Sequence, residues 1–492
     1  MNLYFTGHQE KYAVEQTMLT LFPQERPVYP DPAVTPPGGD NALELQFTRR
    51  PSWCTARAVL RREGKVYTHM CRVRTAALPA DDPVVATRLT RRTLQRAFYL
   101  AAIDCLGKEP PWGMLSGVRP VKLPTRAMEE GGTPLQAEAM LKHYHVSPVR
   151  RQLAMDCAQA SLAVKRSLQP EEISLYVGIP FCPTRCAYCS FISASGSANR
   201  LIPAYLDALF GEIDAAGEAA RRAGKTVRTV YIGGGTPTTL APDQLKALLD
   251  RLHTAFDLAP GTEFTVEAGR PDTITREKLE AIRDGGGNRI SVNPQTMSDL
   301  VLETIGRSHR AEDIRQAYAL AREVRVGAIN MDLIAGLPAD TPAGFAATLD
   351  EVIGMDPENI TVHTLALKKG ARLRQENVTL PSGADVAHML DFAWSALRAA
   401  GYQPYYLYRQ KFMSGSFENV GWCKPGWANA YNICMMEELH TVLSLGAGGV
   451  TKAIGGRAIG GRAVRRLANP KYPQEYLQNA AAIQAEKSSW AW

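Results

Sequence analysis

Three cysteines lie within eight residues of this chain, in the segment GIPFCPTRCAYCSF (Gly178–Phe191). Cys182, Cys186 and Cys189 follow the spacing C-x3-C-x2-C. A disulfide uses two thiols and a closed structural zinc site uses four ligands, so three thiols leave a site incomplete. Three thiolates can hold an iron–sulfur cluster and leave one iron open for a substrate or cofactor. A zinc site completed by a distant histidine or cysteine is the less favoured alternative.

The composition limits the class of protein. The chain has 492 residues, enough for more than one domain, with 45% hydrophobic and 21% charged residues, as in soluble globular proteins. We see no signal peptide and no apolar run that could span a bilayer, so we expect a cytoplasmic protein with no membrane span. The net charge of +7 is mild and no dense Lys/Arg block stands out, which gives nucleic-acid binding no support.

From Ile173 onward, short β-rich runs alternate with stretches of helical periodicity. Six such runs precede or separate the helices: ISLYVGI, TVYIGGG, FTVEAG, RISVN, AINMDLIAG and NITVHTLAL. Alternation of this kind predicts a parallel sheet with helices outside it. Six units would make an incomplete form of the eight-stranded α/β barrel, whose active sites lie at the C-terminal ends of the strands. The cysteine segment directly follows the first of these strands.

The predicted fold class is therefore α/β, a partial (β/α)6 barrel with an N-terminal α+β module and a small C-terminal domain. Residues 1–169 form the module, with strand-like runs near 56–61 and 66–73. Residues 170–367 form the barrel, and residues 368–492 form a domain that we expect to cover the substrate.

Two further signals follow the barrel strands. The glycines of YIGGGTPTTL come after the second strand, and glycine lets backbone groups approach a ligand closely. They lack the Lys and Ser/Thr spacing of a phosphate-binding loop. Polar residues stand at the ends of the next three strands, namely Glu267, Gln295 and Asp332. Their placement predicts a ring around a polar ligand above the sheet.

The cysteine triplet, with Tyr188 before its last member, resembles the radical S-adenosylmethionine signature. The wider strings LYVGIPFC…CAYCSF and WGMLSGVRPVKL resemble the oxygen-independent coproporphyrinogen III dehydrogenase (oxidase) family in its HemZ-type branch. This resemblance covers roughly Ser174 to Lys452. It implies that Cys182, Cys186 and Cys189 bind a [4Fe–4S] cluster. S-adenosylmethionine would bind the open iron and be cleaved by one electron to methionine and a 5′-deoxyadenosyl radical.

The resemblance also implies which residues hold the cofactor. Tyr176 is expected to be catalytic and to touch the sulfonium region, and Tyr188 is expected near the adenine. The methionine amino group is expected to bind at Gly234, Gly235 and Thr236. The ribose hydroxyls and the methionine carboxylate are expected to contact Glu267, Gln295, Asp332 and Arg307. Ala366 is expected to contact the cofactor through its backbone. An arginine fork suits a carboxylate because it can bind both oxygens.

For function, the resemblance implies oxidative decarboxylation of coproporphyrinogen III to protoporphyrinogen IX, with a low-potential electron donor such as flavodoxin or ferredoxin. Phe191 stands where established dehydrogenases carry a further cysteine, and Gly178 replaces a common histidine. Haem-trafficking relatives share the first change, so a haem chaperone or another radical modification of a tetrapyrrole remains an alternative. We interpret His363 as a core histidine.

The C-terminal segment YLYRQKFMSGSFENVGWCKPGWANAYN is rich in aromatic residues and cations. Such a surface suits a large flat ligand that carries carboxylates. We expect the segment to face the barrel mouth and to contact the tetrapyrrole through Tyr408, Arg409, Lys411, Trp422 and Trp427. An ordinary aromatic core beneath a lid is the alternative.

Overall fold

The computed structural model describes residues 1–31, 38–79, 81–190, 193–367, 371–374, 378–410, 417–458 and 461–490. The chain divides into two compact units. One comprises Met1–Val118 with Gly132–Gln152, and the other comprises Arg119–Gly131 with Leu153–Trp492. Within the described residues, none of the helices is both long and apolar enough to cross a membrane.

The first unit is built on a four-stranded sheet in the order β1-β2-β3-β4. β1 and β2 pair in parallel, whereas β2, β3 and β4 pair antiparallel. The strands are β1 (Asn2–Thr6), β2 (Ala42–Arg49), β3 (Trp53–Arg62) and β4 (Lys65–Arg74). The helices are α1 (Lys11–Leu21), α2 (Pro83–Leu106) and α4 (Pro134–His143), and α5 (Pro148–Ser167) begins in this unit.

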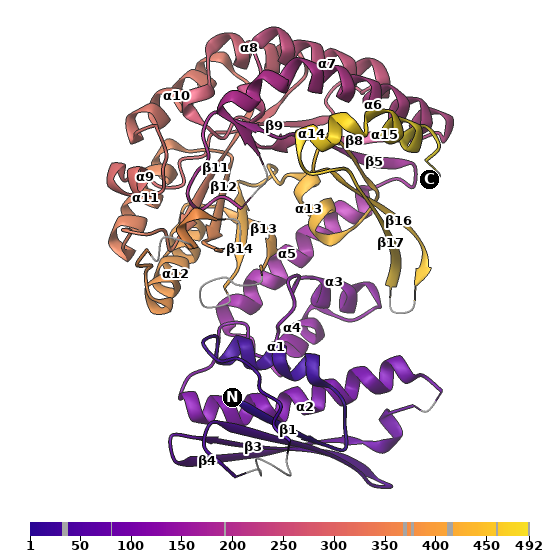
Figure 1. The fold of residues 1–492 in the computed structure, drawn as a ribbon, viewed down its shortest axis with the longest axis vertical. Helices are drawn as coiled ribbons and strands as arrows, with labels where there is room; N and C mark the ends of the chain where they lie inside the picture. The colour runs from indigo at the N-terminus through magenta and orange to yellow at the C-terminus, as the bar shows by residue number, and fades with distance from the viewer. Residues whose placement is uncertain are drawn as a thin grey trace. The chain divides into compact units, whose positions relative to one another are not determined.

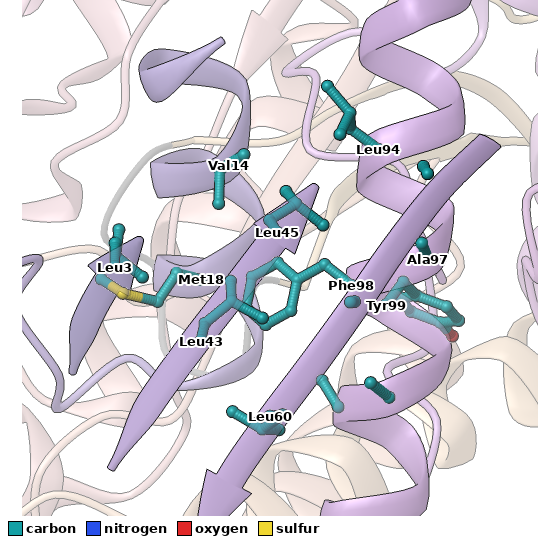
Figure 2. Close-up of a cluster of buried hydrophobic side chains, with 14 of the residues drawn as sticks. Leu3, Val14, Met18, Leu43, Leu45, Leu60, Leu94, Ala97, Phe98 and Tyr99 are labelled. Carbon is teal, nitrogen blue, oxygen red and sulfur yellow. The ribbon is translucent and has the colours of Figure 1, made fainter. Parts of the chain in front are cut away.

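The core of the first unit lies between its sheet and the helices α1 and α2. α2 is bounded by clear end signals, because the Asp82 side chain caps its first turn and Gly107 ends it at a φ of 65°. Phe98 of α2 is fully buried. Figure 2 shows it among apolar side chains from the sheet and from α1, which include Met18, Leu43, Leu45 and Leu60.

The second unit confirms the predicted α/β fold, since the six expected strands are present and pair in parallel, in chain order. They are β5 (Glu172–Ile179), β8 (Thr226–Gly234), β9 (Glu263–Glu267), β10 (Arg289–Ser291), β11 (Ala328–Ala335) and β12 (Asn359–Thr364). The helices between them are α6 (Ile202–Arg222), α7 (Pro242–Phe256), α8 (Arg276–Asp284), α9 (Asp299–Thr304), α10 (Ala311–Val324) and α11 (Pro342–Met355). These helices form an outer arc around the strands (Figure 1).

Residues after 367 add strands to both edges of this sheet. β15 (Val442–Leu445) pairs in parallel with β5, so it forms a seventh parallel strand that the sequence pattern did not indicate. β16 (Val450–Ala458) and β17 (Gly461–Ala468) continue that edge, and β13 (Gln403–Tyr408) and β14 (Asn419–Cys423) extend the other. The remaining helices are α3 (Lys122–Glu129), α12 (Gly383–Ala399), α13 (Ala430–Glu437), α14 (Pro473–Gln478) and α15 (Ala480–Ser488). The domain borders at 169 and 367 stay a prediction.

The barrel strands are held by apolar packing against the outer helices. Leu245, Leu248, Leu249 and Leu252 of α7 are all buried and recur at helical spacing, which gives the helix one apolar face. β5 is buried along nearly its whole length, as expected for a parallel strand covered on both sides. Because the strands run parallel, the loops that follow them meet at one edge of the sheet.

Candidate functional site

The three clustered cysteines lie in the loop that follows β5, at the C-terminal edge of the barrel sheet. In the described part of the chain no cysteine forms a disulfide. All three thiols line a cavity of about 420 Å³. The Ala187 N–H donates to the carbonyl of Ile305 at 2.9 Å, which ties the loop to the region after α9. The thiols are therefore held together, reduced, at the position that the barrel rule predicts.

The glycine-rich loop after β8 packs directly against the cysteine loop. The Gly235 N–H donates to the Ile179 carbonyl at 2.8 Å, and a Cβ on Gly235 would lie 2.5 Å from the Phe181 carbonyl oxygen. Gly234 has a φ of 114°, a conformation that side chains rarely adopt. The Thr236 hydroxyl lies 3.5 Å from the Cys182 sulfur. Glycine is required here because the two loops leave no space for side chains.

Two carboxylates line the same cavity in different electrostatic settings. Burial raises the pKa of Glu267 to about 7, although the Tyr231 hydroxyl donates to it at 2.6 Å and the Gly234 N–H at 3.2 Å. For Asp332, burial also acts to raise the pKa, but contacts with His363 and Asn330 outweigh it and lower the pKa overall. The cavity therefore holds one carboxyl group that titrates near neutral pH and one that stays ionised.

Gln295 follows β10 in a left-handed conformation, with a φ of 67°. Its backbone is fixed against β11, since its N–H donates to the Asp332 carbonyl at 2.9 Å and its carbonyl accepts from Ile334 at 3.0 Å. A non-glycine residue in this region costs about 1–3 kcal/mol and is typical of functional sites. The strained turn places Gln295 in the wall of the cavity.

Arg307 lies between the cysteine loop and the strand ends. Its Nη2 donates to the Tyr188 hydroxyl at 2.9 Å and its Nη1 donates to the Gly269 carbonyl at 3.3 Å. Its Nε is buried and has no hydrogen-bond partner among the described residues. A buried, unpartnered N–H is unfavourable unless a ligand accepts from it. Arg307 thus retains a donor for an anionic group inside the cavity.

Twelve of the thirteen residues that the sequence analysis assigns to the site line this one cavity: Cys182, Cys186, Tyr188, Cys189, Gly234, Gly235, Thr236, Glu267, Gln295, Arg307, Asp332 and Ala366. Tyr176 is the exception. Its ring stacks on that of Tyr231, which does line the cavity, with the ring centroids 6.4 Å apart. The roles of these residues stay predictions.

Sequence reasoning missed several cavity residues. The interpretation of His363 as a core histidine is corrected, because its side chain lines the cavity between Asp332 and Tyr408. Its Nε2 lies 3.7 Å from the Asp332 carboxylate and its Nδ1 lies 3.5 Å from the Tyr408 hydroxyl. Arg270 is also new. It follows β9 and contacts the cysteine loop, but a lone arginine after a strand gives no signal in a single sequence.

The expectation that the whole C-terminal aromatic segment faces the barrel mouth is wrong. Trp422 pairs with Ile360 near the start of β12. The Trp427 carbonyl accepts from Arg289 and Asn359, the first residues of β10 and β12, so it lies at the opposite end of the barrel. The reason is that β14 runs antiparallel to β12 and carries the chain away from the mouth.

Other parts of that segment do lie near the mouth. Tyr406 and Tyr408 line the cavity. Arg409 is buried and does not line it, and burial lowers its pKa to about 10. Lys411 and Phe191 lie outside the described residues.

Comparison with known proteins agrees with this architecture. The family model of the Radical SAM superfamily matches residues 176–352. The chain is 38% identical over 384 residues to the oxygen-independent coproporphyrinogen-III oxidase-like protein HemZ of Bacillus subtilis, covering 76% of each chain. It is 33% identical over 237 residues to the heme chaperone HemW of the same organism, covering 47% of this chain and 62% of that protein. Among solved structures, coproporphyrinogen III oxidase (HemN) from Escherichia coli superposes with a TM-score of 0.51 at 26% identity, covering 66% of this chain and 73% of that chain.

The barrel with its cysteine loop is a radical S-adenosylmethionine domain. The chain belongs to the HemZ family of oxygen-independent coproporphyrinogen-III oxidase-like proteins. Its cofactors are accordingly a [4Fe–4S] cluster and S-adenosylmethionine. The cavity fits them, because it offers three thiols that form no disulfide for the cluster and the Arg307 Nε, which has no partner among the described residues, for an anionic group of the cofactor.

Proposed function

We propose that this chain decarboxylates two propionate groups of coproporphyrinogen III oxidatively, which yields protoporphyrinogen IX. The observation that carries the proposal is the single cavity in which three thiols face a ring of strand-end polar residues and a wall formed by Tyr406 and Tyr408. Cys182, Cys186 and Cys189 would hold the cluster at one end of it.

In this proposal the remaining cavity residues hold S-adenosylmethionine. When bound and reduced, the cofactors supply a 5′-deoxyadenosyl radical that removes one hydrogen atom from a propionate, after which carbon dioxide and one electron leave and a vinyl group remains. Arg307 pairs with the methionine carboxylate, and Gly234 and Gly235 let backbone groups reach the methionine amino group. Glu267 and Asp332 accept hydrogen bonds from the ribose hydroxyls. Tyr176 supports this region through its stacking on Tyr231.

The substrate would enter along the side of the cavity that carries His363 and two tyrosines. The Tyr406 and Tyr408 rings stack nearly parallel, 11° apart, and offer a flat apolar surface to a pyrrole ring. The Tyr408 hydroxyl can donate to a propionate carboxylate, and His363 holds that hydroxyl in place. This arrangement supports a flat substrate that carries carboxylates.

The names of relatives support a tetrapyrrole as the substrate class, since both the HemZ and the HemN relatives are described as coproporphyrinogen oxidases or oxidase-like proteins. The second candidate function is that of a haem carrier, because the HemW relatives are described as heme chaperones. Both candidates use the same cluster, so the cysteine loop does not separate them.

An anaerobic assay separates the two functions. Reconstituted protein is incubated with coproporphyrinogen III, S-adenosylmethionine, a low-potential reductant in place of the proposed flavodoxin or ferredoxin donor, and a one-electron acceptor. We expect protoporphyrinogen IX to form only when S-adenosylmethionine is present, with Cys186→Ala as the inactive control. Tight haem binding without any product, under conditions that release 5′-deoxyadenosine, would show that the chain is a carrier instead.

A further inference from the structure

Arg270 connects three segments of the barrel edge beside the cysteine loop. It lies directly before the 3-10 turn Pro271–Thr273, and only 4% of its surface is exposed. Its Nη1 donates to the sulfur of Cys186 at 3.6 Å, and its Nη2 donates to the Thr184 hydroxyl at 3.1 Å. Nη2 also reaches the Ser308 hydroxyl at 3.0 Å, in the region after α9.

The charge of Arg270 is partly balanced by one carboxylate. Asp272 accepts from Nε at 2.9 Å and from Nη2 at 2.8 Å, a bidentate pair that fixes the plane of the guanidinium. Burial acts to raise the pKa of Asp272, but its hydrogen bonds with Arg270 and Ser308 outweigh this and lower it, so the carboxylate stays ionised. Because Asp272 binds Nε and Nη2 of the guanidinium, Nη1 is directed at the Cys186 sulfur.

We propose that Arg270 is a positioning residue that sets the reduction potential of the cluster through its N–H···S hydrogen bond to Cys186. A hydrogen bond to a ligating sulfur stabilises the more negative, reduced cluster, so it raises the potential. Asp272 works in the opposite direction, because its negative charge offsets that of the guanidinium. The inference rests on the proposed role of Cys186 as a cluster ligand.

The test compares the signs of two effects. In Arg270→Met the donor and the positive charge are lost, so the midpoint potential falls. In Asp272→Asn the guanidinium is no longer neutralised, so the midpoint potential rises. A purely structural role of the pair predicts shifts of the same sign, because both variants would loosen the same loop.

The measurement is a redox titration of the reconstituted protein followed by electron paramagnetic resonance, with iron content determined in parallel. We expect the ratio of reduced to oxidised cluster at a fixed applied potential to fall about tenfold in Arg270→Met, which is about 59 mV for a one-electron couple. Arg270→Lys keeps the charge but loses the fork, so its potential should lie between those of the parent and Arg270→Met. Arg276→Met on the exposed surface of α8 is the matched control and should leave the potential unchanged.

Each outcome decides one point. An unchanged potential in Arg270→Met, or shifts of the same sign in Arg270→Met and Asp272→Asn, overturns the proposal. If Arg270→Met does not retain iron, the midpoint potential of Asp272→Asn decides instead. A potential lower than that of the parent in Asp272→Asn overturns the proposal. A parent protein that binds no cluster refutes the proposed function rather than this inference alone.

Discussion

The core around Phe98 in the first unit and the cavity inside the barrel are lined by different kinds of side chain. Around Phe98 the first unit buries almost only apolar side chains, as Figure 2 shows. Inside the barrel, Ser291, Asn330 and Asp332 line the space between the strands, and the Ser291 hydroxyl has no partner among the described residues. A cavity lined by polar groups in this way suits a polar ligand. The core around Phe98 in the first unit is apolar instead, apart from the Tyr99 hydroxyl.

The cysteines of the two units should also differ, and their replacement should have the largest effect, which is on iron content. Cys186→Ala should abolish the cluster completely, and the same is expected for Cys182 and Cys189, because three ligands are already the minimum. Cys105→Ala in the first unit should retain about four irons per chain. Iron and sulfide analysis after anaerobic reconstitution measures this. Retention of the cluster in Cys186→Ala would contradict the assignment.

Removal of a large side chain should be costly in the apolar interior. Phe98 is fully buried, so Phe98→Ala should destabilise the first unit by about 3–5 kcal/mol. Hydrogen exchange in β2 and β3 reports this locally, without the assumption that both units unfold together. Ser291→Ala is the matched change in the barrel. It should slow hydrogen exchange in β10 or leave it unchanged, since it removes a hydroxyl that has no partner among the described residues. If hydrogen exchange in β3 is as slow in Phe98→Ala as in the parent protein, this prediction is wrong.

The buried carboxyl of Glu267 makes the barrel sensitive to pH. Its pKa in the folded chain is about 7, above the ordinary value of 4.5, mainly because of burial. Between these two values the folded state keeps a proton that the unfolded state has released, so stability falls as the pH rises through this window. At about 1.4 kcal/mol per pKa unit, the total loss is on the order of 3 kcal/mol.

Glu267→Gln should remove this pH dependence in the cofactor-free protein. The measurement is urea unfolding at pH 5 and pH 7.5, followed by hydrogen exchange in β9. Asp332→Asn should not flatten the same window, since the pKa of Asp332 is lowered rather than raised. An equal pH dependence in the parent and in Glu267→Gln would show that another group is responsible.

The smallest expected effect concerns one hydrogen-bonded contact to the cofactor. Arg307→Ala removes a charge-assisted pair worth about 1.5–3 kcal/mol, so S-adenosylmethionine should bind about tenfold more weakly or worse. Equilibrium binding to the reconstituted protein measures this, with cluster content as the control. Arg283→Ala on the outer surface of α8 should bind like the parent, and equal affinity in Arg307→Ala would remove Arg307 from the site.

The sequence predicted the repeating part of the fold and not the later strands that extend its two edges. The six parallel strands follow from local alternation, since each strand and helix carries its own periodicity. β15 has the same apolar character but pairs with β5, from which it is separated by most of the chain. No local pattern encodes such a pairing.

For the site, sequence reasoning succeeded where residues follow strands. Glu267 and Asp332 could be placed because every parallel strand ends at the same edge of the sheet. Trp427 was misplaced because its position depends on the direction of β14, which the composition of the segment does not reveal. Arg270 could not be found, since its contact with Cys186 joins loops from different barrel units and exists only in three dimensions.

The pairing of β15 with β5 has a consequence for synthesis on the ribosome. The Ser174 hydroxyl of β5 shares a hydrogen bond with the ring of His440, which lies two residues before β15 and 266 positions after Ser174. At about 5–20 residues per second, the strand that leads into the cysteine loop waits tens of seconds as an unpaired edge. Exposed strand edges can template aggregation, so we expect the nascent barrel to be most prone to it in this interval. A chain truncated before Val442 would keep the cysteines and lose the strand that covers the edge of β5.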